Sequence, residues 1–166
     1  MASSRDWATG YYKQALADMR GARVLQGAEP SVLAMLLQMV LEKLAKAALL
    51  RSGQITVDHA KGTHRAASTL LFQLGRNKRA CEQLGLAIGT VRHRLAPLVD
   101  RLEASQPALA GDGPCLEYPW ETPSGEIRWP AQHLEVARKF GPKSQEGQLL
   151  FELSLRLCER FEQAFP

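Results

Sequence analysis

The residues from Ser31 to Arg51 constrain the fold more than any other part of the chain, because they combine helical spacing with apolar side chains on most sides of the helix. Their apolar or small residues include Val32, Leu33, Met35, Leu36, Met39, Val40, Leu44, Ala47, Ala48 and Leu50. Such a helix is covered by other helices or lies in a membrane. Its longest apolar run, interrupted by Gln38, has about half of the roughly 20 residues that a bilayer requires. The segment therefore predicts the central helix of a bundle.

Further helices are predicted wherever apolar residues recur at steps of three and four. These segments are 7–25, 66–74, 79–84, 88–104, 131–140 and 144–161, with breaks at 27–31 and at Gly141-Pro142 and with a kink or split expected at Pro97. A chain of 166 residues suits one domain with a sizeable core. We therefore expect an all-α, antiparallel up-and-down helical bundle that forms a single domain over residues 1–166.

Residues 107–130 differ from the rest because they are rich in proline and tryptophan. Two stretches alternate apolar and polar residues, Leu116–Trp120 and Glu126–Trp129, and Glu121–Gly125 between them has the composition of a tight turn. This pattern predicts a β-hairpin insertion in the bundle. Its tyrosine and tryptophans are expected to pack on the helices rather than to bind a base.

Positive charge is concentrated in the middle of the chain. Residues 59–101 contain eight Lys and Arg but two acids, a net charge of +6, while the remainder carries −2. This imbalance favours an anionic partner, such as a nucleotide or RNA. The alternative is a solvated surface on which Lys and Arg cover apolar groups with their aliphatic stems. Three histidines, His59, His64 and His93, lie in the same segment.

The second helix and the turn after it resemble the HEPN family (higher eukaryotes and prokaryotes nucleotide-binding). The resemblance spans about residues 7–74 and includes Glu42–Leu50, the His59 and His64 pair, and Leu70-Leu71. It implies an up-and-down bundle that binds a nucleotide, RNA or a protein partner, or that accompanies a nucleotidyltransferase in a toxin–antitoxin system. Together with the basic segment it gives these candidate ligand-binding residues: Lys46, His59, His64, Arg65, Arg76, Lys78, Arg79, Arg92, His93 and Arg94.

Some proteins of the HEPN family are ribonucleases that dimerise and join two Arg-x4-6-His motifs, without a metal. Arg128 and His133 have this spacing here and are the candidate catalytic pair. The context differs, because Pro130 starts a helix after Arg128 and because Trp129 replaces the usual polar residue. We therefore favour a non-catalytic binding module and keep the ribonuclease as an alternative, with a homodimer as its expected state.

A second alternative is a helix-turn-helix DNA-binding regulator that uses residues 81–95. Cys81 lies four residues before Gly85 and Val91 lies six after it, as in the DNA-reading region of sigma factors. The small residue and the glycine let two helices approach closely, and Thr90, Arg92, His93 and Arg94 would face the DNA. Two bundle helices joined by a glycine turn would give the same pattern.

The sequence gives no sign of a cofactor or metal. The four histidines form no ligand cluster, and no glycine-rich phosphate loop is present. The three cysteines are far apart, which favours reduced, buried thiols in a reducing compartment. Since residues 1–7 have no apolar signal core, we expect a cytoplasmic protein that does not associate with membranes.

Overall fold

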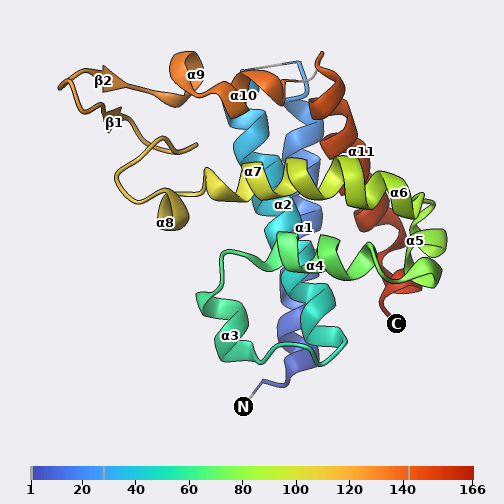
Figure 1. Ribbon diagram of the computed structural model, residues 1–166. Helices are drawn as coiled ribbons and strands as arrows, with labels where there is room; N and C mark the ends of the chain where they lie inside the picture. The colour runs from blue at the N-terminus through green and yellow to red at the C-terminus, as the bar shows by residue number, and fades with distance from the viewer. Residues whose placement is uncertain (1, 28, 142) are drawn as a thin grey trace.

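The computed structural model describes residues 2–27, 29–141 and 143–166. Ala28, within the predicted break between the first two helices, and Pro142, within the predicted break at the end of a later one, lie outside the described residues. The described chain is mainly helical with one two-stranded sheet, so the predicted all-α class is confirmed (Figure 1).

The first two helices, α1 (Ser4–Val24) and α2 (Pro30–Arg51), form a long antiparallel pair (Figure 1). A capping box begins α1, since the Asp6 backbone N–H donates to Ser3 Oγ at 3.2 Å and the Ser3 backbone N–H donates to the Asp6 carboxylate at 2.8 Å. Pro30 occupies the first turn of α2, where its missing N–H leaves no helical hydrogen bond unmade. Local sequence therefore sets where both helices begin.

The centre of the molecule is α2, as its apolar sequence predicted. It is contacted by α1, α4 (Ala66–Leu74), α7 (Ala96–Ala104), α10 (Glu135–Lys139) and α11 (Gln145–Ala164). Its largest fully buried side chains are Leu33, Leu37, Leu41, Leu44 and Leu49. Burial of one leucine side chain stabilises a fold by about 1.5–3 kcal/mol, so this helix supplies much of the driving force for folding.

The middle of the chain adds α3 (Val57–Gly62), α5 (Lys78–Leu84), α6 (Ile88–Thr90) and η1 (Val91–Leu95), a short π-helical segment that continues into α7. Helix α3 lies between the predicted helices at 31–51 and 66–74, where the sequence analysis predicted no helix. The kink predicted at Pro97 is instead a wider turn before it, in which the Ala96 N–H donates to the Val91 carbonyl oxygen. A proline removes an α-helical hydrogen bond and crowds the preceding turn, which the wider π-helical turn accommodates.

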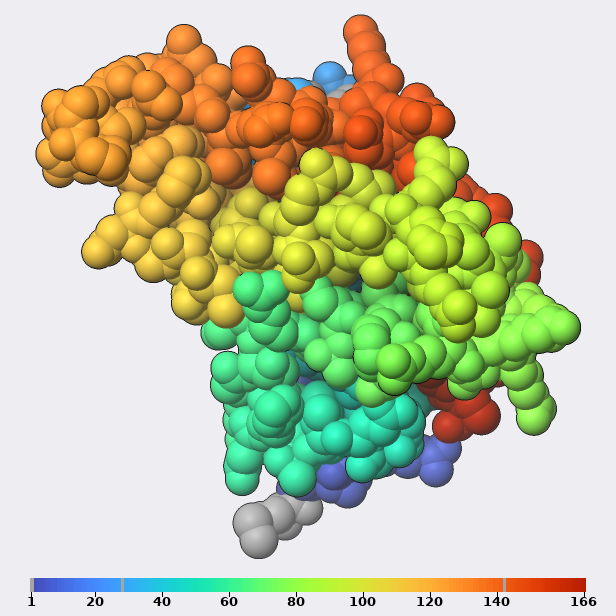
Figure 2. Space-filling view, viewed as in Figure 1, coloured from blue at the N-terminus to red at the C-terminus, as the bar shows by residue number. Residues whose placement is uncertain are grey.

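The proline-rich insertion contains α8 (Pro107–Ala110) and the predicted hairpin, formed by β1 (Trp120–Glu121) and β2 (Ile127–Arg128). Gly125 supplies the positive φ of 81° in its turn. The hairpin projects from the bundle in Figures 1 and 2. Trp120 is buried in the core, as predicted, whereas Tyr118 and Trp129 are 60% and 44% exposed, with Trp129 in contact with His133 of α9.

The single helix predicted over Ala131–Phe140 is wrong. The structure has α9 (Pro130–His133) and α10, separated at Leu134, whose backbone is extended while its side chain is buried. Burying that side chain takes precedence over local helical preference. After this segment Ser144 caps α11, accepting a hydrogen bond from the Gly147 N–H at 2.9 Å, as predicted.

Two further findings concern the described chain as a whole. Cys81, Cys115 and Cys158 are free and buried, as predicted. None of the described helices is both long enough and apolar enough to span a bilayer.

Candidate functional site

Most of the predicted ligand-binding residues lie on one surface, which we call the basic face. It runs from the end of α4 across α5 to η1 and consists of Arg76, Lys78, Arg79, Arg92, His93 and Arg94, all of them exposed. In Figure 2 these elements form the green to yellow-green projections at the side of the molecule opposite the hairpin. The structure thus gathers side chains that are up to 18 residues apart, from position 76 to position 94.

Hydrogen bonds and backbone conformation hold the three elements of the basic face together. The Arg92 Nε–H donates to the Gly75 carbonyl oxygen, which ties η1 to the end of α4. The Asn77 side chain caps α5, accepting from the Ala80 N–H at 3.0 Å. Gly85 turns the chain after α5 with a φ of 67°, a conformation that favours glycine.

Further support of this surface comes from α11. The Arg156 guanidinium donates to the Gly85 carbonyl oxygen, and the Arg160 guanidinium donates to that of Gln83 at 3.3 Å. These bonds satisfy carbonyl groups at the C-terminal end of α5 and place two more cations beside it. The basic face therefore rests on an ordered scaffold.

An exposed aromatic ring lies at the edge of the basic face. Phe72 is 57% exposed, and the Arg76 guanidinium carbon lies 3.9 Å from its ring centroid. Sequence reasoning missed Phe72, although a signal existed. Leu70, Leu71 and Leu74 form the buried stripe of α4, so the helical period directs the residue at position 72 outward.

The charges of the basic face are largely uncompensated. Within residues 2–27, 29–141 and 143–166, Lys78 is its only member with an ion pair, to Glu82 at 3.7 Å. Both partners are exposed, and such a pair contributes roughly 0–1 kcal/mol in water. The face therefore keeps a positive potential that attracts anions.

Residues 81–95 form two helical segments joined by a turn at Gly85, the local structure that both the helix-turn-helix alternative and two bundle helices predict. Helix α5, the Gly85 turn and the continuous helix from Ile88 to Ala104 follow one another, and Val91 is buried as the motif requires. The second helix crosses α2 rather than packing along its length (Figure 1). Arg92, His93 and Arg94 are exposed, and Arg92 also donates a hydrogen bond to the Gly75 carbonyl oxygen.

Two predicted residues, Lys46 and His64, lie together elsewhere, around Glu42. The Lys46 Nζ is 2.6 Å from Glu42 Oε1, and the His64 Nδ1 is 3.6 Å from the same oxygen. The Gln38 side-chain amide donates to Glu42 Oε2 at 2.8 Å. This cluster borders a cavity of about 470 Å³, described further below. Its Glu42 and Gln38 were not among the predicted ligand-binding residues.

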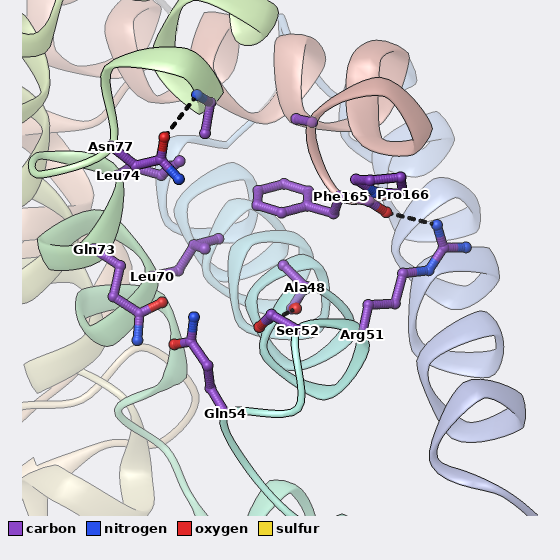
Figure 3. Close-up of a pocket in the computed structure, with 12 residues that line it drawn as sticks. Ala48, Arg51, Ser52, Gln54, Leu70, Gln73, Leu74, Asn77, Phe165 and Pro166 are labelled. Atoms are coloured by element: carbon purple, nitrogen blue, oxygen red, sulfur yellow. Dashed lines mark hydrogen bonds between the residues drawn. The ribbon is translucent and has the colours of Figure 1, made fainter.

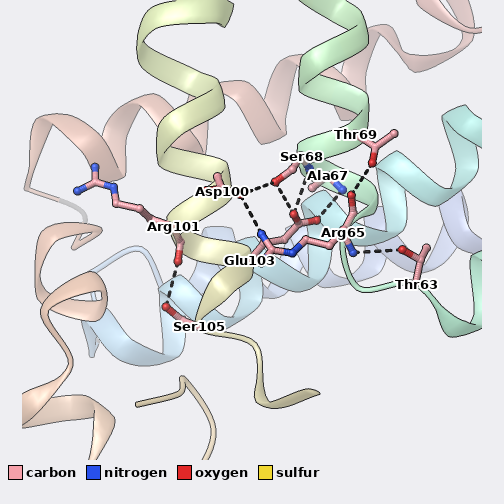
Figure 4. Close-up of polar contacts among 9 residues, drawn as sticks. All are labelled: Thr63, Arg65, Ala67, Ser68, Thr69, Asp100, Arg101, Glu103 and Ser105. Atoms are coloured by element: carbon pink, nitrogen blue, oxygen red, sulfur yellow. Dashed lines mark hydrogen bonds and ion pairs between the residues drawn. The ribbon is translucent and has the colours of Figure 1, made fainter. Parts of the chain in front are cut away.

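Arg65 belongs to a structural network rather than to the basic face (Figure 4). Its guanidinium pairs with Asp100 at 2.9 Å. Beside it, the buried Glu103 accepts hydrogen bonds from the Ala67 N–H at 2.7 Å and the Ser68 N–H at 3.2 Å. Burial raises the pKa of Glu103, and the hydrogen bonds from Ser68 and Ala67 oppose that rise. This carboxylate caps α4 from α7.

The remaining predicted residues are not brought together. His59 is exposed on α3 and belongs neither to the basic face nor to the cluster around Glu42. Arg128 pairs with Glu126 at 2.9 Å in its own hairpin. The His133 Nδ1 accepts from the Trp129 N–H at 3.3 Å, and its ring packs edge-on against Trp129. The two candidate catalytic residues thus contact different neighbours: Arg128 contacts Glu126, and His133 contacts Trp129.

A separate pocket of about 300 Å³ opens between the ends of α2, α4 and α11 (Figure 3). Side-chain amides of Gln54, Gln73 and Asn77 line it together with apolar groups. Its one charged residue is Arg51, which is held by Glu162 at 2.5 Å and donates to the Phe165 carbonyl oxygen at 2.9 Å. This pocket contains none of the predicted residues.

Comparison with known proteins adds no relative, because no family model, curated protein or solved structure matches the chain. Within the described residues, no group of three or more His, Cys, Asp and Glu side chains is arranged to hold a metal ion.

Proposed function

We propose that this protein is an RNA-binding module that holds a single-stranded segment on the basic face. The observation that carries the proposal is the exposed Phe72 ring beside a set of largely unpaired cations. Single-stranded nucleic acids are bound by this combination, because cations contact the phosphates while bases stack on aromatic rings. The HEPN resemblance over residues 7–74 supports the same class of ligand.

Each part of the basic face has a distinct role in this proposal. Lys78, Arg79 and Arg94 contact phosphates, since their long cationic side chains are exposed. Phe72 stacks on a base, and Arg76, already over that ring, extends the stacking surface with its planar guanidinium. Arg92 keeps η1 against α4 through Gly75 and thereby positions its neighbours.

The test is a salt titration of binding to a labelled single-stranded RNA, with the RNA checked for cleavage on a gel. If Lys78, Arg79 and Arg94 each neutralise one phosphate, log affinity falls against log salt with a slope of about −2. The triple variant R76E/K78E/R79E should bind at least tenfold more weakly. The control R5E/K13E/R20E reverses three exposed charges on α1 and should retain binding.

Phe72 separates stacking from simple charge attraction. F72A should weaken binding to single-stranded RNA by roughly tenfold, since one base stack contributes about 1–3 kcal/mol. The matched control is V24A, because Val24 is exposed to an even greater extent on α1. Equal losses in both charge variants, or no binding by the wild type, would refute the proposal. RNA cut by the wild type but intact with H133A would revive the ribonuclease alternative.

A duplex-DNA regulator is the second candidate. It is favoured by the left-handed turn at Gly85 and by His93 and Arg94 exposed at the start of the following helix. For duplex DNA the same three cations predict a steeper slope of about −2.7. Tighter binding to duplex than to single strands, lost in H93A/R94A and unchanged in F72A, would favour this candidate over the RNA-binding module.

A further inference from the structure

The cavity bordered by the Glu42 cluster lies between α1, α2 and the segment after α7, and we call it the α1–α2 cavity. We propose that it binds a small, flat, uncharged heteroaromatic molecule that carries N–H donors along one edge. This site is separate from the basic face, and the inference does not depend on RNA binding. Its volume of about 470 Å³ falls within the range of small-molecule sites, roughly 300–1,000 Å³.

Part of the cavity wall is apolar and adaptable. The ring of Tyr11 and the side chains of Met35 and Met39 line it, and all three are only partly buried. Methionine thioethers are polarisable and pack well against aromatic rings. A flat aromatic molecule can therefore lie against this wall, whereas a flexible aliphatic chain would lose more conformational entropy on binding.

The charges of Glu42, Lys43 and Lys46 in the wall are already paired with protein groups. Lys46, which is only 5% exposed, pairs with Glu42 at 2.6 Å, and Lys43 pairs with Asp18 at 2.6 Å. Breaking a buried pair would leave one charge without a partner, which is strongly unfavourable. A phosphate group would have to compete with these carboxylates. An uncharged ligand leaves both pairs intact, which is why we exclude an anion here and place it on the basic face.

One buried polar atom of the wall lacks a hydrogen-bond partner within the described residues, and it is an acceptor. The Gln106 Oε1 is buried and has no hydrogen-bond partner within the described residues, although an unsatisfied buried amide oxygen is uncommon and unfavourable. The Gln38 Nε2–H donates to Glu42 Oε2 at 2.8 Å, and the Gln38 Oε1 is an acceptor. Glu117 adds an exposed carboxylate to the lining. Acceptors around a ring-sized space select a ligand whose edge carries N–H groups.

Gln106 and Glu117 come from outside α1 and α2. Gln106 follows α7 at the N-cap of α8, and Glu117 lies in the proline-rich insertion. The insertion therefore completes the cavity wall. Amino-substituted heterocycles such as adenine, cytosine and their nucleosides have the required shape, neutrality and donors.

The test is calorimetric titration of the full chain with adenine, cytosine, adenosine and AMP. We expect at least one uncharged compound to bind with a dissociation constant below the millimolar range, and AMP to bind no more tightly than adenosine. Q106M removes the acceptor but keeps the length of the side chain, and should weaken binding at least tenfold. The control Q26M makes the same change at an exposed position and should bind as the wild type does.

Two further variants make the outcome decisive. M39W should fill the cavity and abolish binding while the far-ultraviolet circular dichroism stays native. R76E/K78E/R79E should lose RNA but retain the heterocycle, so that failure of one site is distinguishable from failure of the other. Absence of binding by all uncharged compounds, binding only when a phosphate is present, or equal loss in Q106M and Q26M would overturn the proposal.

Discussion

Glu103 offers the sharpest test of how the fold supports the basic face. Its side chain is 1% exposed and caps α4 from α7, accepting from the Ala67 and Ser68 N–H groups and, at 2.5 Å, from Ser68 Oγ. E103A leaves the two backbone donors without an acceptor. Since each such buried donor costs about 1–3 kcal/mol, we expect the free energy of unfolding to fall by about 4 kcal/mol.

E103Q should be milder. The glutamine oxygen can still accept from the Ala67 N–H, but its amide cannot accept from the Ser68 N–H. Removing a buried charge offsets part of that loss, so we expect the free energy of unfolding to fall by about 1 kcal/mol near neutral pH.

The pH dependence of Glu103 has a definite sign. Because burial raises the pKa of this carboxyl above its unfolded value of about 4.3, the folded chain holds the proton to higher pH than the unfolded chain. Its stabilising contribution is complete below the unfolded pKa and is lost as pH rises through the folded pKa. Glutamine does not titrate. The stability difference between wild type and E103Q should therefore shrink as pH rises through that window.

Urea unfolding followed by circular dichroism measures these differences at each pH, with an unchanged m-value as the check on two-state behaviour. E82A is the control, because Glu82 is exposed and its ion pair with Lys78 is long; its effect should stay within about 0.5 kcal/mol. A loss below about 1 kcal/mol in E103A, or a difference between wild type and E103Q that grows with rising pH, would refute this reasoning.

Two other predictions concern packing. G147A should destabilise the fold by about 3 kcal/mol, since a Cβ there would lie 2.6 Å from the Phe140 carbonyl oxygen, whereas G10A has open space and should stabilise α1 by about 0.5–1 kcal/mol in the same urea assay. Burial raises the pKa of Cys158 to about 12, so this thiol should resist iodoacetamide near pH 8 until denaturant is added; rapid alkylation of the native protein at Cys158 would contradict its burial.

Local patterns in the sequence were sufficient for most of the helices. The bounds predicted for α4 agree with the structure, and the predicted helix over 88–104 is continuous through α6, η1 and α7. Apolar spacing and capping residues act over a few positions, so they can be read without knowing the fold. The division at Leu134 could not be predicted, because the core that buries this side chain is assembled from distant elements.

For the candidate sites, too, local sequence indicated some features, and others depended on contacts between distant residues. The charge imbalance of residues 59–101 indicated the basic face, and the helical period of α4 contained the signal for Phe72. Sequence could not show that Arg65 forms an ion pair with Asp100, or that Arg92 donates a hydrogen bond to the Gly75 carbonyl oxygen. Those partners are 35 and 17 positions away along the chain, and only packing brings them within hydrogen-bond distance.

The sequence by itself determined that this protein is a helical bundle around one central helix, because the apolar surface of residues 31–51 has to be covered. It also determined that the excess positive charge lies in one segment. Tertiary structure alone decided which polar groups share a cavity. Lys46 and Gln106 are 60 positions apart, and α7 and the proline-rich insertion bring Gln106 to the wall that Lys46 lines. Long-range packing sets such contacts, and local periodicity carries no information about them.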